Sequence, residues 1–207
     1  KLATYYQLRN QFVDLIRIAK LHGPKFVFAH LGLPHPPCVF DRDGGYSGDR
    51  KESDAKKCAD QVAFTAQKLK EVIGQLLDAT HGRAVIIVQT DEGPYQLDHL
   101  RWGLIAHGNY DRPGAREELL PKYRILNAYF LPGVAHTRLY PTITPVNSFR
   151  LVFDLYFHTK LRLLPDQMWG LQTHPVSQFV NLTELLTGGN GCRGSGSASP
   201  PVEDRCP

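Results

Sequence analysis

The chain has 207 residues, of which 42% are hydrophobic and 21% are charged, and its formal net charge is +4. These fractions are typical of a folded globular protein, and the length suffices for one well-packed domain. Because the basic residues are dispersed along the chain, the charge disfavours nucleic acid as the main partner. No stretch approaches the roughly 20 consecutive apolar residues of a membrane span, and no signal segment opens the chain. The first residue is Lys1 rather than Met, which indicates a processed or truncated product.

Two amphipathic helices are predicted, over residues 4–21 and 53–78, because apolar side chains recur there every three or four positions. The apolar pattern of the first helix ends before His22-Gly23-Pro24, and that of the second ends at Thr80-His81-Gly82. The inward faces are predicted to carry Tyr5, Leu8, Phe12, Leu15, Ile16 and Ala19 in the first helix and Val62, Ala66, Leu69, Ile73 and Leu76 in the second.

Three apolar runs predict strands, at residues 25–31, 84–88 and 123–131, and the first two of these are predicted to be buried. The run at 84–88 lacks alternation, which is typical of a strand buried on both faces inside a parallel sheet. Strand, loop, long helix and strand in that order indicate a βαβ unit. We therefore expect an α/β fold with a mostly parallel sheet and flanking helices.

Asp91 and Glu92 follow the strand at 84–88 directly, and Gly93-Pro94 prevents it from continuing. The carboxyl ends of strands in an open α/β sheet are where ligands bind. Two adjacent carboxylates there are suited to a hard divalent cation, namely Ca²⁺, Mg²⁺ or Mn²⁺. The alternative is an ordinary polar turn after a strand.

His35 lies in a proline-rich loop that leaves the strand at 25–31. The flanking prolines restrict the backbone and hold the imidazole in one direction, which suits a contact with substrate. A rigid loop with a surface histidine is the alternative. Asp41 and Asp43 allow a calcium site, although an Asp-x-Asp-Gly stretch without further ligands is more typical of a turn.

Four cysteines are present, and they form no CxxC or Cys/His cluster of the zinc type. Cys38 with Cys58 and Cys192 with Cys206 would each close a loop in an oxidising compartment, with four isolated thiols as the alternative.

The rest of the chain carries weaker signals. Residues 95–122 show no sustained helix or strand periodicity and are longer than a simple connecting loop. An active-site loop or a disordered excursion is therefore expected there, with His99 and His107 in solvent. Thr144 before Pro145 predicts an N-cap and a helix over 146–158. Residues 188–207 are rich in Gly, Ser and Pro and are predicted to form a disordered tail after a domain spanning 1–187. In the helix predicted over 146–158, the inward side chains are expected to be Phe149, Val152, Phe153 and Phe157.

Four blocks of the chain, taken in order, resemble the later half of the catalytic domain of bacterial sulfatase-like proteins. That family belongs to the alkaline phosphatase superfamily, together with arylsulfatases, lipoteichoic acid synthases and phosphoethanolamine transferases. The resemblance covers roughly residues 25 to 181, and its blocks are Phe-Val-Phe-Ala-His-Leu with Pro-His-Pro-Pro at 26–37, Val-Ile-Ile-Val-Gln-Thr-Asp-Glu-Gly-Pro at 85–94, Leu-Asn-Ala-Tyr-Phe-Leu-Pro-Gly at 126–133 and Thr-Pro-Val-Asn-Ser-Phe-Arg at 144–150.

The resemblance implies metal-dependent cleavage or transfer of a sulfate or phosphate ester, including esters linked to lipids or glycans. The family's metal-ligating pair maps onto Asp91 and Glu92, where Glu departs from the commoner His or Asn. The family's catalytic and substrate-contacting histidine maps onto His35, with His30 near it. The resemblance also implies a place at the cell membrane, on its extracytoplasmic side, through membrane helices that precede these residues.

Two parts of the family pattern map onto no residue here: the first strand with its early metal acid, and the Ser, Thr or Cys nucleophile. We therefore expect this chain to be a fragment that is inactive alone, because losing the nucleophile removes covalent catalysis. The alternative is a non-catalytic relative that acts as a binding or scaffold module. A nucleotide-binding domain is disfavoured because no GxGxxG or GxxxxGK[ST] follows any strand.

Overall fold

The computed structural model describes residues 1–93, 110–172 and 178–188. The chain divides into two compact units: Lys1–Ile86 with Phe130–Pro132, and Ile87–Tyr129 with Gly133–Pro207. Each unit is described by itself.

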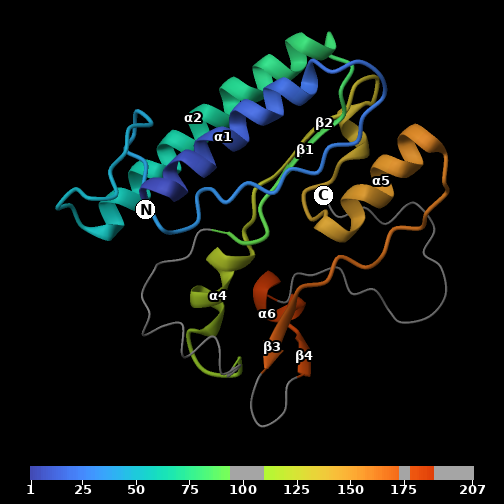
Figure 1. Cartoon of the computed structure of the whole chain (residues 1–207). Coiled ribbons are helices and arrows are strands. Elements are labelled where there is room, and N and C mark those ends of the chain that lie inside the picture. Colours follow the sequence, from blue (N-terminus) through green and yellow to red (C-terminus); the bar gives the residue numbers. More distant parts are fainter. Residues whose placement is uncertain (94–109, 173–177, 189–207) are drawn as a thin grey trace. The chain divides into compact units, whose positions relative to one another are not determined.

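The first unit is built on two long helices, α1 (Leu2–Ala19) and α2 (Asp54–Thr80), which lie side by side (Figure 1). Both predicted helices are confirmed. Ser53 caps α2, because its side chain accepts a hydrogen bond from the backbone N–H of Lys56. In α1 the predicted Tyr5, Leu8 and Phe12 are buried, but in α2 the predicted Val62 is 51% exposed.

The core of the first unit joins α1 and α2 to the loop after residue 32. The loop contributes Leu33, Val39 and Phe40, and Phe40 stacks on Phe64 of α2 with a centroid separation of 4.6 Å. Burial of these aromatic and aliphatic side chains holds the loop against the helices. The buried members are Tyr5, Leu8, Phe12, Leu33, Val39, Phe40 and Val72.

Residues 25–31 are not a buried strand, so that prediction was wrong. The segment has no regular secondary structure, and Phe26 and Phe28 are each 80% exposed. Aromatic and β-branched residues favour an extended backbone, but a strand also needs a neighbour that pairs with its edge, and burial needs elements that pack on its faces. Nothing in the described part of the chain pairs with this segment.

The expected parallel sheet is also contradicted. Within the described residues there are two sheets of two strands each: β1 (Ile86–Gln89) with β2 (Asn127–Phe130), and β3 (Trp169–Gln172) with β4 (Gln178–Asn181). Both pairs are antiparallel. The fold is therefore not the α/β alkaline-phosphatase-like one. The apolar run identified the strand β1, which is half-buried, but a run cannot define its partner.

Helix α5 (Pro145–Phe157) begins where predicted, with Pro145 in its first turn. Its phase differs from the prediction. Val152 is buried as expected, but Phe149, Phe153 and Phe157 are exposed. The buried positions next to Val152 are Asn147, Ser148 and Leu151.

A second core lies in the second unit, between α4 (Ala115–Tyr123), the β3–β4 hairpin and α6 (Thr183–Thr187). Leu119, Leu182 and Leu186 are its buried members. A short 3₁₀ helix, η1 (His136–Arg138), precedes α5. The predicted tail beyond Gly188, the pair Cys192 and Cys206, and most of the loop with His99 and His107 lie outside the described residues.

Candidate functional site

The turn that follows β1 is fixed by backbone contacts at both ends. The N–H of Thr90 donates to the carbonyl of Leu126 at 3.0 Å, and the N–H of Leu126 donates to Thr90 Oγ1 at 3.0 Å. At the other end, the N–H of Gly93 donates to the carbonyl of Lys122 at 2.7 Å. Asp91 and Glu92 are thus held between two anchored residues.

Position 93 requires glycine because two backbone carbonyls approach it closely. A Cβ at this position would lie 2.1 Å from the carbonyl oxygen of Pro121 and 2.5 Å from that of Arg124. Backbone atoms cannot move aside as a flexible side chain can, so any larger residue would displace the turn. The glycine after the acidic pair therefore sets the position of the two carboxylates.

The two carboxylates differ in their surroundings. Glu92 Oε1 lies 3.1 Å from Lys122 Nζ, in a pair that is partly exposed on both sides. Asp91 is exposed and makes no side-chain hydrogen bond or ion pair within the described residues. A lysine therefore already compensates one charge, while the other faces solvent.

Carboxylate oxygens fit the predicted hard divalent cation, but this turn provides only part of a coordination shell. No group of three or more His, Cys, Asp or Glu side chains gathers among the residues that the structure describes. A cation here would take one or two oxygens from Asp91 and Glu92, in competition with Lys122, and the remainder from elsewhere.

The loop that carries His35 is held to α2 by Gln61, whose side chain is fully buried. Gln61 Nε2 donates to the carbonyls of Pro34 and His35, both at 3.1 Å. Its Oε1 accepts from the N–H groups of Val39 and Phe40, at 2.8 and 3.3 Å. One amide thus binds both ends of the loop, a role that hydrophobic periodicity does not indicate because Gln61 is polar.

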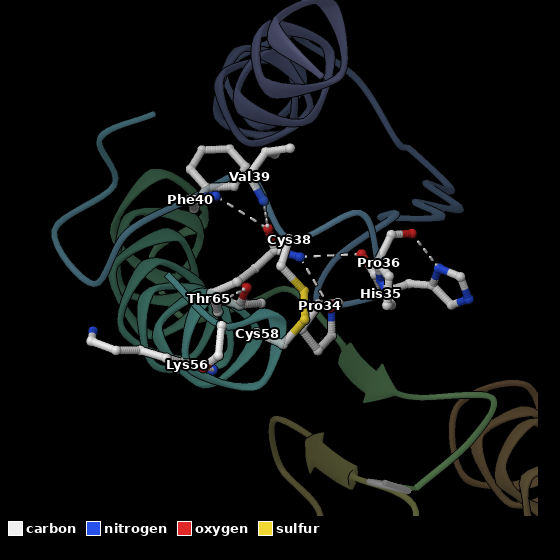
Figure 2. The surroundings of a disulfide bond; sticks show 11 residues. Pro34, His35, Pro36, Cys38, Val39, Phe40, Lys56, Cys58 and Thr65 are labelled. Carbon is white, nitrogen blue, oxygen red and sulfur yellow. Dashed lines mark hydrogen bonds between the residues drawn. A yellow bond between two sulfur atoms is a disulfide. The ribbon is translucent and has the colours of Figure 1, made fainter. Parts of the chain in front are cut away.

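A disulfide between Cys38 and Cys58 also joins this loop to α2, with a Cα–Cα distance of 5.0 Å (Figure 2). The disulfide was one of the two alternatives for this cysteine pair and is the one observed.

The imidazole of His35 is exposed and points away from the disulfide (Figure 2). Its Nδ1 lies 2.6 Å from the carbonyl oxygen of Pro36. Because a carbonyl only accepts, Nδ1 carries the hydrogen, and in the neutral ring Nε2 presents its lone pair to solvent. Nε2 can therefore accept a proton or a hydrogen bond, or bind a cation.

His30 is exposed as well, and its backbone carbonyl accepts a hydrogen bond from Gln11 Nε2 at 3.3 Å. His30 and His35 belong to the first unit, whereas Asp91 and Glu92 belong to the second. The structure therefore joins the two acids in one turn and describes the two histidines separately from them.

Asp41, the other candidate ligand, has a structural role. Its Oδ1 accepts from the N–H groups of Asp43 and Gly45 at 3.1 and 2.7 Å, and its Oδ2 lies 2.7 Å from Arg50 Nη2. Both oxygens are occupied in closing the turn. The turn alternative describes this stretch better than a calcium site does.

A buried polar network fixes the strand end that precedes the acidic pair. Gln89 Nε2 donates to Asn127 Oδ1 at 2.8 Å and to Ser148 Oγ at 2.6 Å, and the Tyr129 hydroxyl lies 2.5 Å from Ser148 Oγ. Ser148 is fully buried. The network ties β1 and β2 to the first turn of α5. In the sequence, the network is indicated only by the polar pair Asn147-Ser148 at the start of the helix predicted over 146–158.

Asp166 stabilises the N-terminus of α5 in place of the predicted side-chain cap. The backbone N–H and the hydroxyl of Thr144 donate to Asp166 Oδ1 at 2.9 and 2.6 Å, and buried Asn147 donates to the same oxygen at 2.8 Å. Burial, followed by the hydrogen bond with Asp166, raises the pKa of Tyr140. A carboxylate at a helix N-terminus is favourable with the helix dipole.

Comparison with protein families, with curated proteins and with solved structures finds no match for this chain. The resemblance to sulfatase-like proteins accordingly stays a prediction from the four sequence blocks.

Proposed function

We propose that the chain is part of a metal-dependent, sulfatase-like hydrolase or phospho-group transferase that acts on sulfate or phosphate esters at the cell envelope. The observation that carries the proposal is the anchored turn after β1, which presents Asp91 to solvent beside Glu92.

Asp91 and Glu92 are the residues that would hold a divalent cation. When bound, such a cation stabilises negative charge on the oxygens of a sulfate or phosphate ester during cleavage. The chain's own contribution is to fix the two carboxylates through Gly93 and Thr90. The role of His35 toward the ester or its leaving group rests on the sequence resemblance alone, and the nucleophile is not among the residues of the four sequence blocks.

The disulfide supports the proposed extracytoplasmic location, because disulfides persist mainly in oxidising compartments. Cys38–Cys58 links a loop to a helix within one unit, as structural disulfides in exported proteins do. In the described part of the chain, no helix combines the length and apolarity that a membrane crossing requires.

The proposal is tested by turnover of aryl sulfate and aryl phosphate esters with Mn²⁺, Mg²⁺ or Ca²⁺, in the longest natural form of the protein. Asp91→Asn should abolish cation-dependent turnover and leave the unfolding temperature unchanged. Asp78→Asn, at an exposed position of α2, is the matched control and should retain full activity. Turnover that survives Asp91→Asn would remove Asp91 from the site.

The ion pair between Glu92 and Lys122 favours a second candidate, a non-catalytic binding or scaffold module. If the turn binds a cation, Lys122→Gln should tighten binding, because it frees Glu92 and removes a positive charge. If the acids serve only the fold, neither the wild type nor Lys122→Gln should bind a cation, and the substitution should only lower stability.

A further inference from the structure

Helix α5 exposes an apolar stripe along one face. Its members follow each other at spacings of three, four and four residues, which places them on one side of the helix. The rings of Phe149 and Phe153 lie 6.0 Å apart, and those of Phe153 and Phe157 lie 6.2 Å apart, so the three rings form a continuous ladder. The α5 aromatic stripe consists of Val146 (51% exposed), Phe149 (37%), Phe153 (39%) and Phe157 (69%).

The opposite face of α5 is already buried. Leu151 and Val152 are 5% and 6% exposed, and Asn147 and Ser148 are fully buried in the polar networks described above. A helix that is apolar on both faces normally buries both. Contiguous exposed aromatic side chains of this kind mark an interaction surface.

Positive charge accompanies the stripe. The segment that follows α5 exposes Leu161, Leu163 and Leu164, with the exposed Lys160 before them and the exposed Arg162 between the first two. Over residues 145–164 there are three basic side chains and one acidic one, Asp154, giving a net charge of +2. The carboxylate of Asp154 accepts from the backbone N–H of Lys160 at 3.0 Å and lies 3.9 Å from Arg138, so it is already engaged locally.

We propose that the α5 aromatic stripe and the basic segment after it bind an anionic lipid surface. An aromatic face with adjacent Lys and Arg is the pattern of a helix that lies in the membrane interface, with rings among the acyl chains and cations at the head groups. Charge favours this occupant over a second copy of the chain, since a two-fold contact would bring the same positive segments together. The inference is independent of the proposed ester chemistry.

The test is co-sedimentation of the chain with vesicles of phosphatidylserine and phosphatidylcholine, compared with phosphatidylcholine alone. We expect binding to the anionic vesicles that weakens at high salt. Phe153→Ser with Phe157→Ser should reduce partitioning by more than about tenfold, given the apolar area each ring buries. Lys160→Gln with Arg162→Gln should reduce it by about fivefold per charge, on anionic vesicles only.

Phe179→Ser is the matched control, because Phe179 is 76% exposed on β4 and does not belong to the stripe. It should bind as the wild type does. The emission of Phe157→Trp should shift to shorter wavelength on vesicle addition, whereas that of Phe179→Trp should not. Equal binding of all variants, equal binding to both vesicle types, or a stripe-dependent dimer in the absence of lipid would overturn the proposal.

Discussion

Replacing Gln61 with Leu removes the side-chain amide that binds both ends of the His35 loop. Leu has a similar volume and a good helix propensity, so the helix α2 and the packing around it should persist. The change deletes two bonds donated by the amide nitrogen and two accepted by its oxygen. Its effect therefore reports the polar contribution of this residue to the first unit.

The size of the expected stability loss depends on which hydrogen-bond partners of Gln61 cannot bind water instead. Val39 and Phe40 are fully buried, so their N–H groups lose the acceptor with no replacement, at about 1 to 3 kcal/mol each. The bond from Phe40 is long, at 3.3 Å, and its loss should fall at the lower end. The carbonyls of Pro34 and His35 are more accessible and can turn to water. We expect a total loss of about 3 kcal/mol in the free energy of unfolding.

Urea unfolding monitored by circular dichroism measures this loss, and thermal unfolding should show a fall of roughly 12 to 24 °C for a unit of this size. Gln67→Leu makes the same substitution at an exposed position of α2 and should change stability by less than about 0.5 kcal/mol. A loss below about 1 kcal/mol for Gln61→Leu would refute the reasoning, because it would mean that the two buried N–H groups find other acceptors.

Three further outcomes are expected. Reducing the Cys38–Cys58 bond should destabilise the first unit by about 3 kcal/mol, measured by urea unfolding with and without dithiothreitol; an unchanged midpoint would contradict it. Ser148→Ala should leave the Gln89 amide with Asn127 as its remaining acceptor, remove the Ser148 partner of the Tyr129 hydroxyl and lower the free energy of unfolding by about 1 to 3 kcal/mol in urea; an unchanged stability would show that the network does not stabilise the fold. Burial raises the pKa of Tyr123 to about 12, so its contribution to stability is present below about pH 10 and is lost as pH rises toward 12; Tyr123→Phe should flatten the alkaline part of the stability curve, and unchanged curvature would contradict the assignment.

Local patterns predicted the helices well. The spacing of Tyr5, Leu8 and Phe12 identified both the extent and the buried face of α1, because burial there is decided by apolar side chains alone. In α5 the same reasoning found the helix but chose the wrong face. Asn147 and Ser148 are buried by hydrogen bonds to Asp166 and Gln89, and hydrophobic periodicity contains no information about such partners.

The strands show what local patterns could not predict, namely which segments pair. The run before Gln89 is a strand, but its antiparallel partner lies at Asn127–Phe130, and an apolar run does not specify the direction or identity of a partner. Residues 25–31 have strong β propensity and yet pair with no described segment. Propensity sets the backbone conformation, whereas a sheet depends on contacts far away in the sequence.

Only part of the candidate site could be predicted from the sequence, for the same reason. The acidic pair and the glycine after it are adjacent in sequence, and a turn at that point could be predicted. Lys122 stands thirty residues after Glu92, and the carbonyls that force glycine at position 93 belong to α4 and its C-terminal end. Contacts of this kind follow from the fold and not from a local motif.

Titration of the ¹⁵N-labelled chain with Mn²⁺, followed by NMR, tests most directly whether the turn after β1 binds a divalent cation. Paramagnetic broadening should begin at the amides of Asp91, Glu92 and Gly93, and Asp91→Asn should abolish it while Asp78→Asn leaves it intact. Broadening that starts at other carboxylates, or that is the same in Asp91→Asn, would show that these acids shape a turn and do not hold a cation.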